Sequence, residues 1–180
     1  MVKFIHAADV HLGIMVAGVE KSQKEIAREL KQAAFDAFER VIDTAIEEEV
    51  DALVLAGDLL DSSRTFVKEK CFLQSQLNRL APFGIPVVVA LGNHDAGRAY
   101  VSGKHIYTFG SAVETIEVET RNGERVAFSG FSYEVPVVAT RKVQEYPTKS
   151  ANCDIHIGVL HGELTTSEGR YAPFSIPELR

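Results

Sequence analysis

The chain has 180 residues, of which 46% are apolar and 24% charged, enough to bury one sizeable core and to favour a single domain. Its formal net charge of −6 excludes the overall basic field typical of strong nucleic-acid binders, but it does not exclude a locally basic groove. No apolar run approaches the roughly 20 residues that a membrane-spanning helix needs, so we expect no membrane partner.

The two cysteines and the N-terminus favour a cytoplasmic protein. Cys71 and Cys153 lie far apart and in no metal-type spacing, which favours buried free thiols over a disulfide or a zinc site. The first ten residues contain no signal-peptide core.

The first hundred residues alternate between strand and helix patterns. Residues 2–8 predict a buried strand, residues 51–57 a second and residues 85–92 a third, while residues 22–50 and 66–80 predict the helices between them. Because all three strands are continuously apolar, we expect a parallel sheet that is covered on both faces.

The first helix has an apolar face and a start signal. Its apolar residues recur at three- and four-residue steps, which predicts that they face the core; they are Ile26, Leu30, Ala33, Ala37, Val41 and Ala45. Ser22 and Glu25 have the spacing of a capping box.

The second half of the chain has shorter strands. Residues 111–120 and 124–133 flank Asn122 and Gly123 and predict a hairpin, and residues 153–163 return to the buried-strand pattern. Near the C-terminus, Ser175, Pro177 and Glu178 have the pattern of a helix start. Only Leu179 and Arg180 follow, so we expect a domain, spanning residues 1–180, that is incomplete at its C-terminus.

Polar side chains gather where the apolar strands end. Asp9 and His11 follow the first strand, Asp58 the second, Asn93 the third and His161 the last. In an open α/β sheet, ligands bind outside the carboxyl ends of the strands. Asp9 and His11 are two residues apart, so both project to one side if the backbone stays extended.

A metal centre explains these positions together. A single aspartate after a strand is usually a turn residue, and a single histidine is usually hydrogen-bonded, which is our expectation for His6, His105 and His156. Five such residues at successive strand ends are better explained by one binuclear site. Mixed oxygen and nitrogen ligands without thiolate suit Mn²⁺, Fe²⁺ or Zn²⁺.

Four short motifs resemble those of the calcineurin-like metallophosphoesterases. They are Asp-Val-His at residues 9–11, Gly-Asp-Leu-Leu-Asp at 57–61, Gly-Asn-His-Asp at 92–95 and His-Gly-Glu at 161–163. Within that superfamily, the contexts of the first and last motifs and the closing Tyr171–Arg180 are similar to the SbcD-type DNA repair exonucleases. The resemblance implies a metallophosphoesterase-type β-sandwich flanked by helices and built on a βαβαβ core.

The resemblance also implies a role for each site residue. Asp9 and His11 would bind one divalent ion, Asp58 would bridge two ions, and Asn93 and His161 would bind the second. His94 would face the phosphate, with Asp95 orienting its imidazole.

We expect two divalent ions at this site, Mn²⁺ first, with Fe²⁺, Zn²⁺ or Mg²⁺ as alternatives. The resemblance implies DNA, an SbcC-type ATPase and a second copy of the chain as partners. The family's last metal motif, Gly-His-x-His, is absent, so we expect each ion to lack one histidine and to bind weakly.

Three functions stay open on the sequence alone. The first is metal-dependent hydrolysis of DNA, with two ions activating water and His94 as an imidazolium assisting the leaving oxygen. The second is hydrolysis of a nucleotide or another small phosphoester, and the third is a non-catalytic docking scaffold. DNA contact would rest on local cations such as Lys68, Lys70, Arg98 and Lys104, a density that is also typical of a solvated face.

Overall fold

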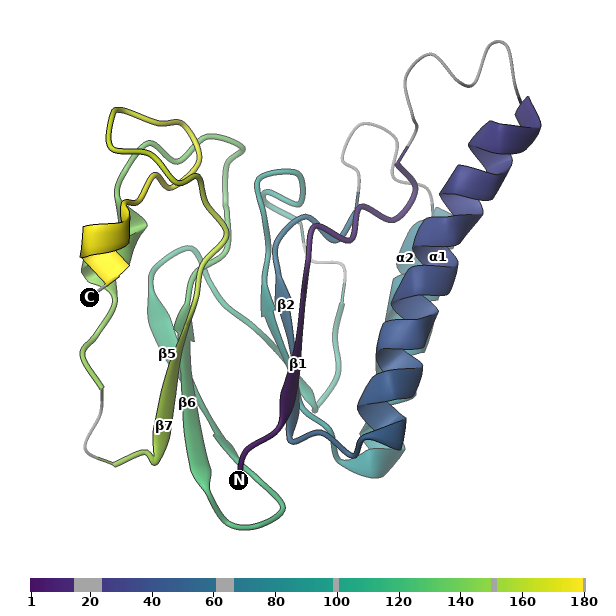
Figure 1. The fold of residues 1–180 in the computed structure, drawn as a ribbon, viewed down its shortest axis with the longest axis horizontal. Coiled ribbons are helices and arrows are strands. Elements are labelled where there is room, and N and C mark those ends of the chain that lie inside the picture. Colours follow the sequence, from purple (N-terminus) through teal and green to yellow (C-terminus); the bar gives the residue numbers. More distant parts are fainter. Residues whose placement is uncertain (15–23, 61–66, 99–100, 150–151, 180) are drawn as a thin grey trace.

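The protein folds into three layers: a sheet, a second sheet and a pair of helices (Figure 1). The structure, a computed structural model, describes residues 1–14, 24–60, 67–98, 101–149 and 152–179. One sheet lies in the middle, with the helices against one face and the second sheet against the other. The predicted sandwich flanked by helices is confirmed.

The central sheet is parallel throughout. Its strands are β1 (Phe4–Ala8), β2 (Ala52–Ala56), β3 (Val87–Ala90) and β4 (Ile106–Thr108), in the order β1-β2-β3-β4. The first three were expected from their apolar runs, whereas β4 was not, because a strand of only 3 residues carries too little pattern to recognise.

The second sheet has three strands, β5 (Glu114–Glu119), β6 (Arg125–Gly130) and β7 (Ile155–Val159). The hairpin of β5 and β6 is confirmed, with Gly123 at φ 79° in the turn, a conformation that glycine adopts without steric cost. β7 pairs with β6 in parallel, so its carboxyl end points the same way as the end of β6.

Two α-helices connect the strands of the central sheet, α1 (Lys24–Glu47) between β1 and β2, and α2 (Val67–Asn78) between β2 and β3. Short 3-10 helices lie at Ala81–Phe83 (η1), Lys142–Glu145 (η2) and Ile176–Leu179 (η3). Among the described residues, no helix combines the length and the apolar character that crossing a membrane requires.

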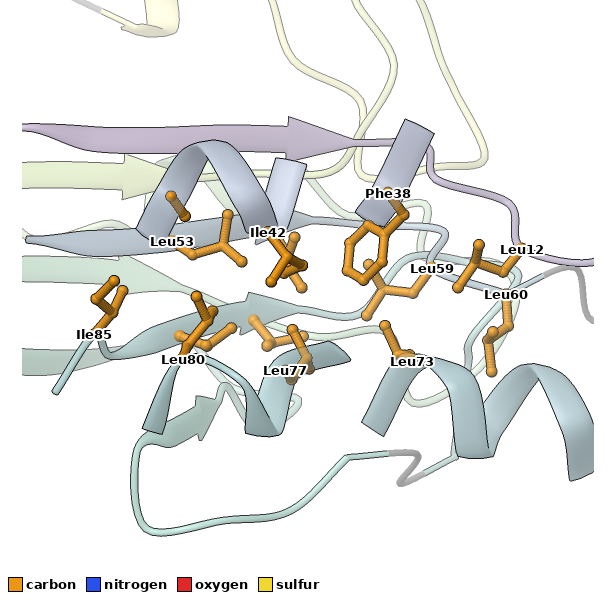
Figure 2. Close-up of a cluster of buried hydrophobic side chains, with 14 of the residues drawn as sticks. Leu12, Phe38, Ile42, Leu53, Leu59, Leu60, Leu73, Leu77, Leu80 and Ile85 are labelled. Atoms are coloured by element: carbon orange, nitrogen blue, oxygen red, sulfur yellow. The ribbon is translucent and has the colours of Figure 1, made fainter. Parts of the chain in front are cut away.

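The main core lies between the helices and the central sheet (Figure 2). Phe38 and Ile42 of α1 and Leu73 of α2 point toward this layer and are at most 2% exposed. Leu53 and Leu55 of β2 face the helices, while alternate residues such as Val54 face the second sheet, as the two-residue period of a strand requires.

The apolar face predicted for α1 is wrong over the first half of the helix, where Ala33 and Ala37 are exposed as well as Ile26 and Leu30; only Ala45 of the six predicted residues is buried. Ile26 and Leu30 are 42% and 44% exposed, while Phe35 and Phe38 provide the buried face instead. The helix extends past the end of the central sheet at its start (Figure 1), so the described strands do not cover its early apolar residues. Ser22, the predicted cap, lies outside the described residues.

Two further burial predictions need correction. β1 and β7 were expected to be buried, but each is partly exposed, because each is an edge strand with a neighbour on one side only. Neither cysteine forms a disulfide, as expected, but Cys71 is exposed and only Cys153 is buried.

The predicted helix start near the C-terminus corresponds to η3. Both the backbone N–H and the hydroxyl of Ser175 donate to Glu178 Oε2, at 2.8 and 2.7 Å. The serine and the glutamate therefore interact at the start of this helical turn, as the sequence pattern indicates.

The face of α1 can be tested with two substitutions of similar size. Ile42→Ala should lower the free energy of unfolding by about 2–5 kcal/mol, because Ile42 fills the core. Leu30→Ala should lower it by about 1 kcal/mol or less, because Leu30 is largely exposed. Urea unfolding of both variants measures the difference, and an equal loss for the two would contradict the observed face.

Candidate metal centre

The polar residues predicted at the strand ends do converge. Asp9, His11, Asp58 and Asn93 all follow strands of the central sheet, whose parallel carboxyl ends share one edge. His161 comes from the other sheet, after β7, and still reaches this edge, because its Nε2 lies 3.1 Å from Asn93 Oδ1. The two sheets therefore contribute to one site.

Asp58 lies at the centre of the group. Its side chain is 6% exposed, and its Oδ1 accepts the backbone N–H of His94 at 2.9 Å. Its Oδ2 lies 3.4 Å from His161 Nε2 and 3.7 Å from His11 Nε2. One carboxylate thus faces two imidazoles that come from different sheets.

Asp9 and His11 meet for a different reason from the one expected. The backbone does not stay extended after β1, since φ is 52° at Asp9 and 45° at His11. Their N–H groups instead donate to the carbonyls of Gly57 and Asp58, at 3.1 and 2.9 Å. The side chains still lie close, with His11 Nε2 3.9 Å from Asp9 Oδ1.

Strained backbone marks the same residues. Asp58, like Asp9 and His11, has a positive φ, at 49°, a conformation that is sterically costly for residues with a side chain. Such strain persists only where the surrounding structure imposes it, and it is common at functional sites.

The residues present fit a metal ion. Asp9, Asp58 and His161 each offer a ligand atom, and these atoms lie within 4.8 Å of one another. His11 Nδ1 is buried and has no hydrogen-bond partner within the described part of the chain, a costly arrangement unless a group from outside the chain satisfies it. Oxygen and nitrogen ligands together suit a divalent transition-metal ion.

Two glycines leave room for the ligands. A Cβ at Gly92 would lie 2.1 Å from Asp58 Oδ1, and a Cβ at Gly57 would lie 2.1 Å from His161 Nδ1. Gly57 also has φ 85°. No side chain can occupy either position without displacing a candidate ligand.

Asp58 and His161 change each other's pKa. Burial by itself raises the pKa of Asp58, but the hydrogen bonds from His161 and from the His94 N–H outweigh it, so the pKa lies below its usual value. Burial likewise lowers the pKa of His161, but the hydrogen bond and the charge of Asp58 raise it to a net value above normal. Each of the two groups therefore favours the charged form of the other.

His94 lies beside the candidate ligands. Its ring is 5.2 Å from the ring of His11, edge to face. It also lines a cavity of about 300 Å³ next to Asn93. The imidazole is thus placed where a molecule bound at the centre would meet it.

Asp95 is buried and contacts the backbone of two loops. It is 0% exposed, and its carboxylate accepts three backbone N–H groups, from Leu59, Leu60 and Gly92, at 3.0–3.1 Å. Burial raises the pKa of Asp95, although these three hydrogen bonds oppose the shift. Asp95 therefore ties the loop after β2 to the loop after β3, and its orienting of the His94 imidazole stays a prediction.

Sequence reasoning missed Tyr133, and it quoted Glu163 without assigning a role to it. The hydroxyl of Tyr133 donates to the backbone carbonyl of His161 at 3.1 Å, and Glu163 Oε1 accepts the N–H groups of Arg170 and Tyr171. Glu163 had a signal in the His-Gly-Glu motif, whereas Tyr133 had none, because its contact depends on how the second sheet packs.

Two of the histidines expected to make ordinary hydrogen bonds, His105 and His156, do so. His105 Nε2 lies 3.0 Å from the carbonyl of Leu77, and His156 Nε2 lies 2.7 Å from Ser129 Oγ.

Comparison with known proteins finds one matching family and several relatives. The family model described as calcineurin-like phosphoesterase matches residues 2–178. An uncharacterized metallophosphoesterase of Bacillus subtilis, YhaO, is 35% identical, with 98% of this chain and 45% of YhaO covered. A DNA double-strand break repair protein of Haloferax volcanii, Mre11, is 32% identical, with 92% of this chain and 35% of Mre11 covered.

The chain thus spans less than half the length of each of these two relatives. Among solved structures, a dimetal phosphatase of Danio rerio has a TM-score of 0.42 and 16% identity, over 71% of this chain and 43% of that one. A likeness at this level supports no argument about the site.

The close contact of Gly57 with His161 predicts a specific loss of metal binding. Gly57→Ala should weaken Mn²⁺ binding at least about tenfold, because the new methyl group displaces His161 and a misplaced ligand loses its bond to the ion. Gly123→Ala is a matched control, since Gly123 also has positive φ but an added Cβ would meet nothing within 4 Å. Calorimetric titration compares them, and equal affinities would contradict the predicted clash.

Metal binding should release a proton and weaken in acid. A bound imidazole must be neutral, and the pKa of His161 is raised above 6.5, so protons compete increasingly as the pH falls through that raised value. Asp58 adds no proton near neutrality, because its pKa is lowered.

Mn²⁺ titrations in buffers of different ionisation enthalpy count the released protons. His156→Gln should keep the wild-type pH dependence, because His156 bonds to Ser129 outside the candidate centre. Affinity that stays constant between pH 6 and 8 would refute the prediction.

Proposed function

Since the chain belongs to the calcineurin-like phosphoesterase family, we propose that it is a metal-dependent hydrolase of phosphodiester bonds in DNA, a repair exonuclease or endonuclease. The observation that supports this most directly is the meeting of Asp9, Asp58 and His161, whose ligand atoms lie within 4.8 Å of one another at one edge of the sheet.

The proposal assigns ligand roles to five residues. Asp9 and His11 hold one divalent cation, Asp58 contributes to both, and Asn93 and His161 hold the second. Asp58 suits the shared position, because its two oxygens face groups from three different loops. Cations bound here, with Mn²⁺ the proposed metal, supply Lewis acidity that activates water and neutralises charge on the phosphate.

His94 acts on the phosphate side in this proposal. Its imidazole lines the cavity beside Asn93, and its backbone N–H fixes the Asp58 carboxylate at the same time. As an imidazolium, it stabilises the developing negative charge or gives its proton to the leaving oxygen. Asp95 supports this arrangement from behind, by holding the loop on which His94 lies.

DNA as the substrate is supported by the relatives rather than by the metal chemistry. The Haloferax volcanii relative is named as a DNA double-strand break repair protein, and another of that name, from Aeropyrum pernix, is 36% identical over 95 residues. By analogy we also propose an SbcC-type ATPase partner, a homodimer and a cytoplasmic location, with residues 1–180 forming a nuclease domain.

Replacing His94 tests its part in the reaction. His94→Ala, in the protein at its full natural length, should retain metal and lose about 10²- to 10⁴-fold in kcat, the usual contribution of a general acid. The control is His156→Ala, which removes an imidazole that bonds to Ser129 outside the centre and should keep kcat within about twofold. A wild-type rate for His94→Ala would remove this residue from the mechanism.

A substrate comparison tests the function itself. The full-length protein with Mn²⁺ is incubated with linear duplex DNA and, separately, with a chromogenic phosphodiester. Release of nucleotides from DNA supports the nuclease, activity on the small ester alone supports a small-molecule phosphodiesterase, and no hydrolysis of either with metal bound supports a docking scaffold.

A further inference from the structure

Two arginines line the cavity beside the candidate metal centre. The cavity of about 300 Å³ has Asn93 and His94 in its wall, and the same wall contains Arg98 and Arg170, with Val137 and Tyr171 adding apolar surface. The hydrolytic chemistry described above uses neither arginine. Both residues are exposed.

The wall that contains Arg98 is held in place by backbone contacts. The N–H of Arg98 donates to the carbonyl of Asp95 at 3.2 Å, and the neighbouring Gly97 N–H donates to the carbonyl of Tyr133 at 3.1 Å. Asp95 is itself held by three backbone N–H groups. The backbone of Arg98 is thus held in a fixed position close to the candidate metal centre.

The part of the cavity lining around Arg170 is held by backbone contacts as well. The N–H of Val138 donates to the carbonyl of Arg170 at 2.9 Å, and the N–H of Ala172 donates to the carbonyl of Val138 at 2.7 Å. Glu163 Oε1 accepts the N–H of Arg170. A Cβ on Gly169 would lie 1.9 Å from that same oxygen, so glycine is required for this contact.

The charge of the cavity points to an anionic ligand. Within the described residues, Arg170 makes its hydrogen bonds through its backbone, and its guanidinium forms no ion pair. The chain as a whole has a net charge of −6. The two arginines therefore make the cavity lining locally positive on an acidic protein. Guanidinium groups bind phosphate oxygens through paired N–H donors, and two from separate loops can enclose one phosphate.

We infer that Arg98 and Arg170 form a second phosphate subsite, which binds the phosphate next to the one being hydrolysed. This inference rests on the proposed function, because the metal centre defines the first position. It also narrows the substrate: a strand with successive phosphates occupies both positions, whereas a small ester with one phosphate occupies only the first. The subsite therefore selects a polynucleotide chain.

Binding without catalysis tests the subsite first. The probe is a fluorescein-labelled thymidine oligonucleotide in EDTA, and affinity is measured by anisotropy over a range of salt concentrations. Arg98→Ala and Arg170→Ala should each weaken binding about 3- to 10-fold and reduce the slope of log K against log salt by about 0.7.

The control for this measurement is Arg121→Ala. Arg121 is an arginine beside Glu49 and Val50, outside the cavity, and its loss should leave the affinity and the salt slope at wild-type values. Binding that does not change in the two cavity variants, or wild-type protein that does not bind the probe, would overturn the inference.

Kinetics on the full-length protein give a second measurement. The quantity is the ratio of kcat/KM for the thymidine dinucleotide with a 5′-phosphate to kcat/KM for the same dinucleotide without it. The wild-type ratio should exceed about 10 and fall toward 1 when both arginines are replaced, because only the former substrate has a phosphate for the subsite.

The two experiments separate the subsite from the proposed function. If the arginine variants hydrolyse DNA with an unchanged kcat/KM ratio and bind the probe with unchanged affinity, the subsite is overturned but the proposed hydrolase function is not. Arginine-dependent binding without any hydrolysis would support the subsite and overturn the proposed function.

Discussion

The buried carboxylate of Asp58 is the constraint around which the site is organised. A charge that is almost fully withdrawn from water has to be compensated by nearby donors and positive charge, and here the His94 N–H and the imidazoles of His11 and His161 face it. These groups come from three other segments of the chain. Compensating one carboxylate therefore brings the ends of β1, β3 and β7 together.

The space around this carboxylate explains features that otherwise look unrelated. Gly92 is required because any side chain there would collide with Asp58 Oδ1. Gly57 is required because any side chain at that position would collide with His161. The positive φ of Asp9, His11 and Asp58 costs free energy, which the packed core of the parallel sheet and the three hydrogen bonds of Asp95 can offset. The stable scaffold thus holds strained loops in one arrangement.

Prediction of the fold succeeded where a local pattern reports directly on burial. β2 and β3 are buried on both faces and read as continuous apolar runs, and the β5–β6 hairpin has its Asn-Gly turn. It failed on α1, where Leu30 and Phe35 are both apolar but only Phe35 of the two is buried. Periodicity identifies a helix, but the length of the neighbouring sheet decides which of its turns are covered.

By itself, the sequence determined which chemical groups stand at the ends of the strands, because parallel strands end at a common edge and place Asp9, Asp58 and Asn93 there. Only the tertiary structure decided the rest. It bent the backbone at Asp9 and His11, directed Asp95 to backbone N–H groups, and brought Arg98 and Arg170 into one cavity wall. The physical reason is that these arrangements depend on contacts between loops remote in the chain, which no local pattern encodes.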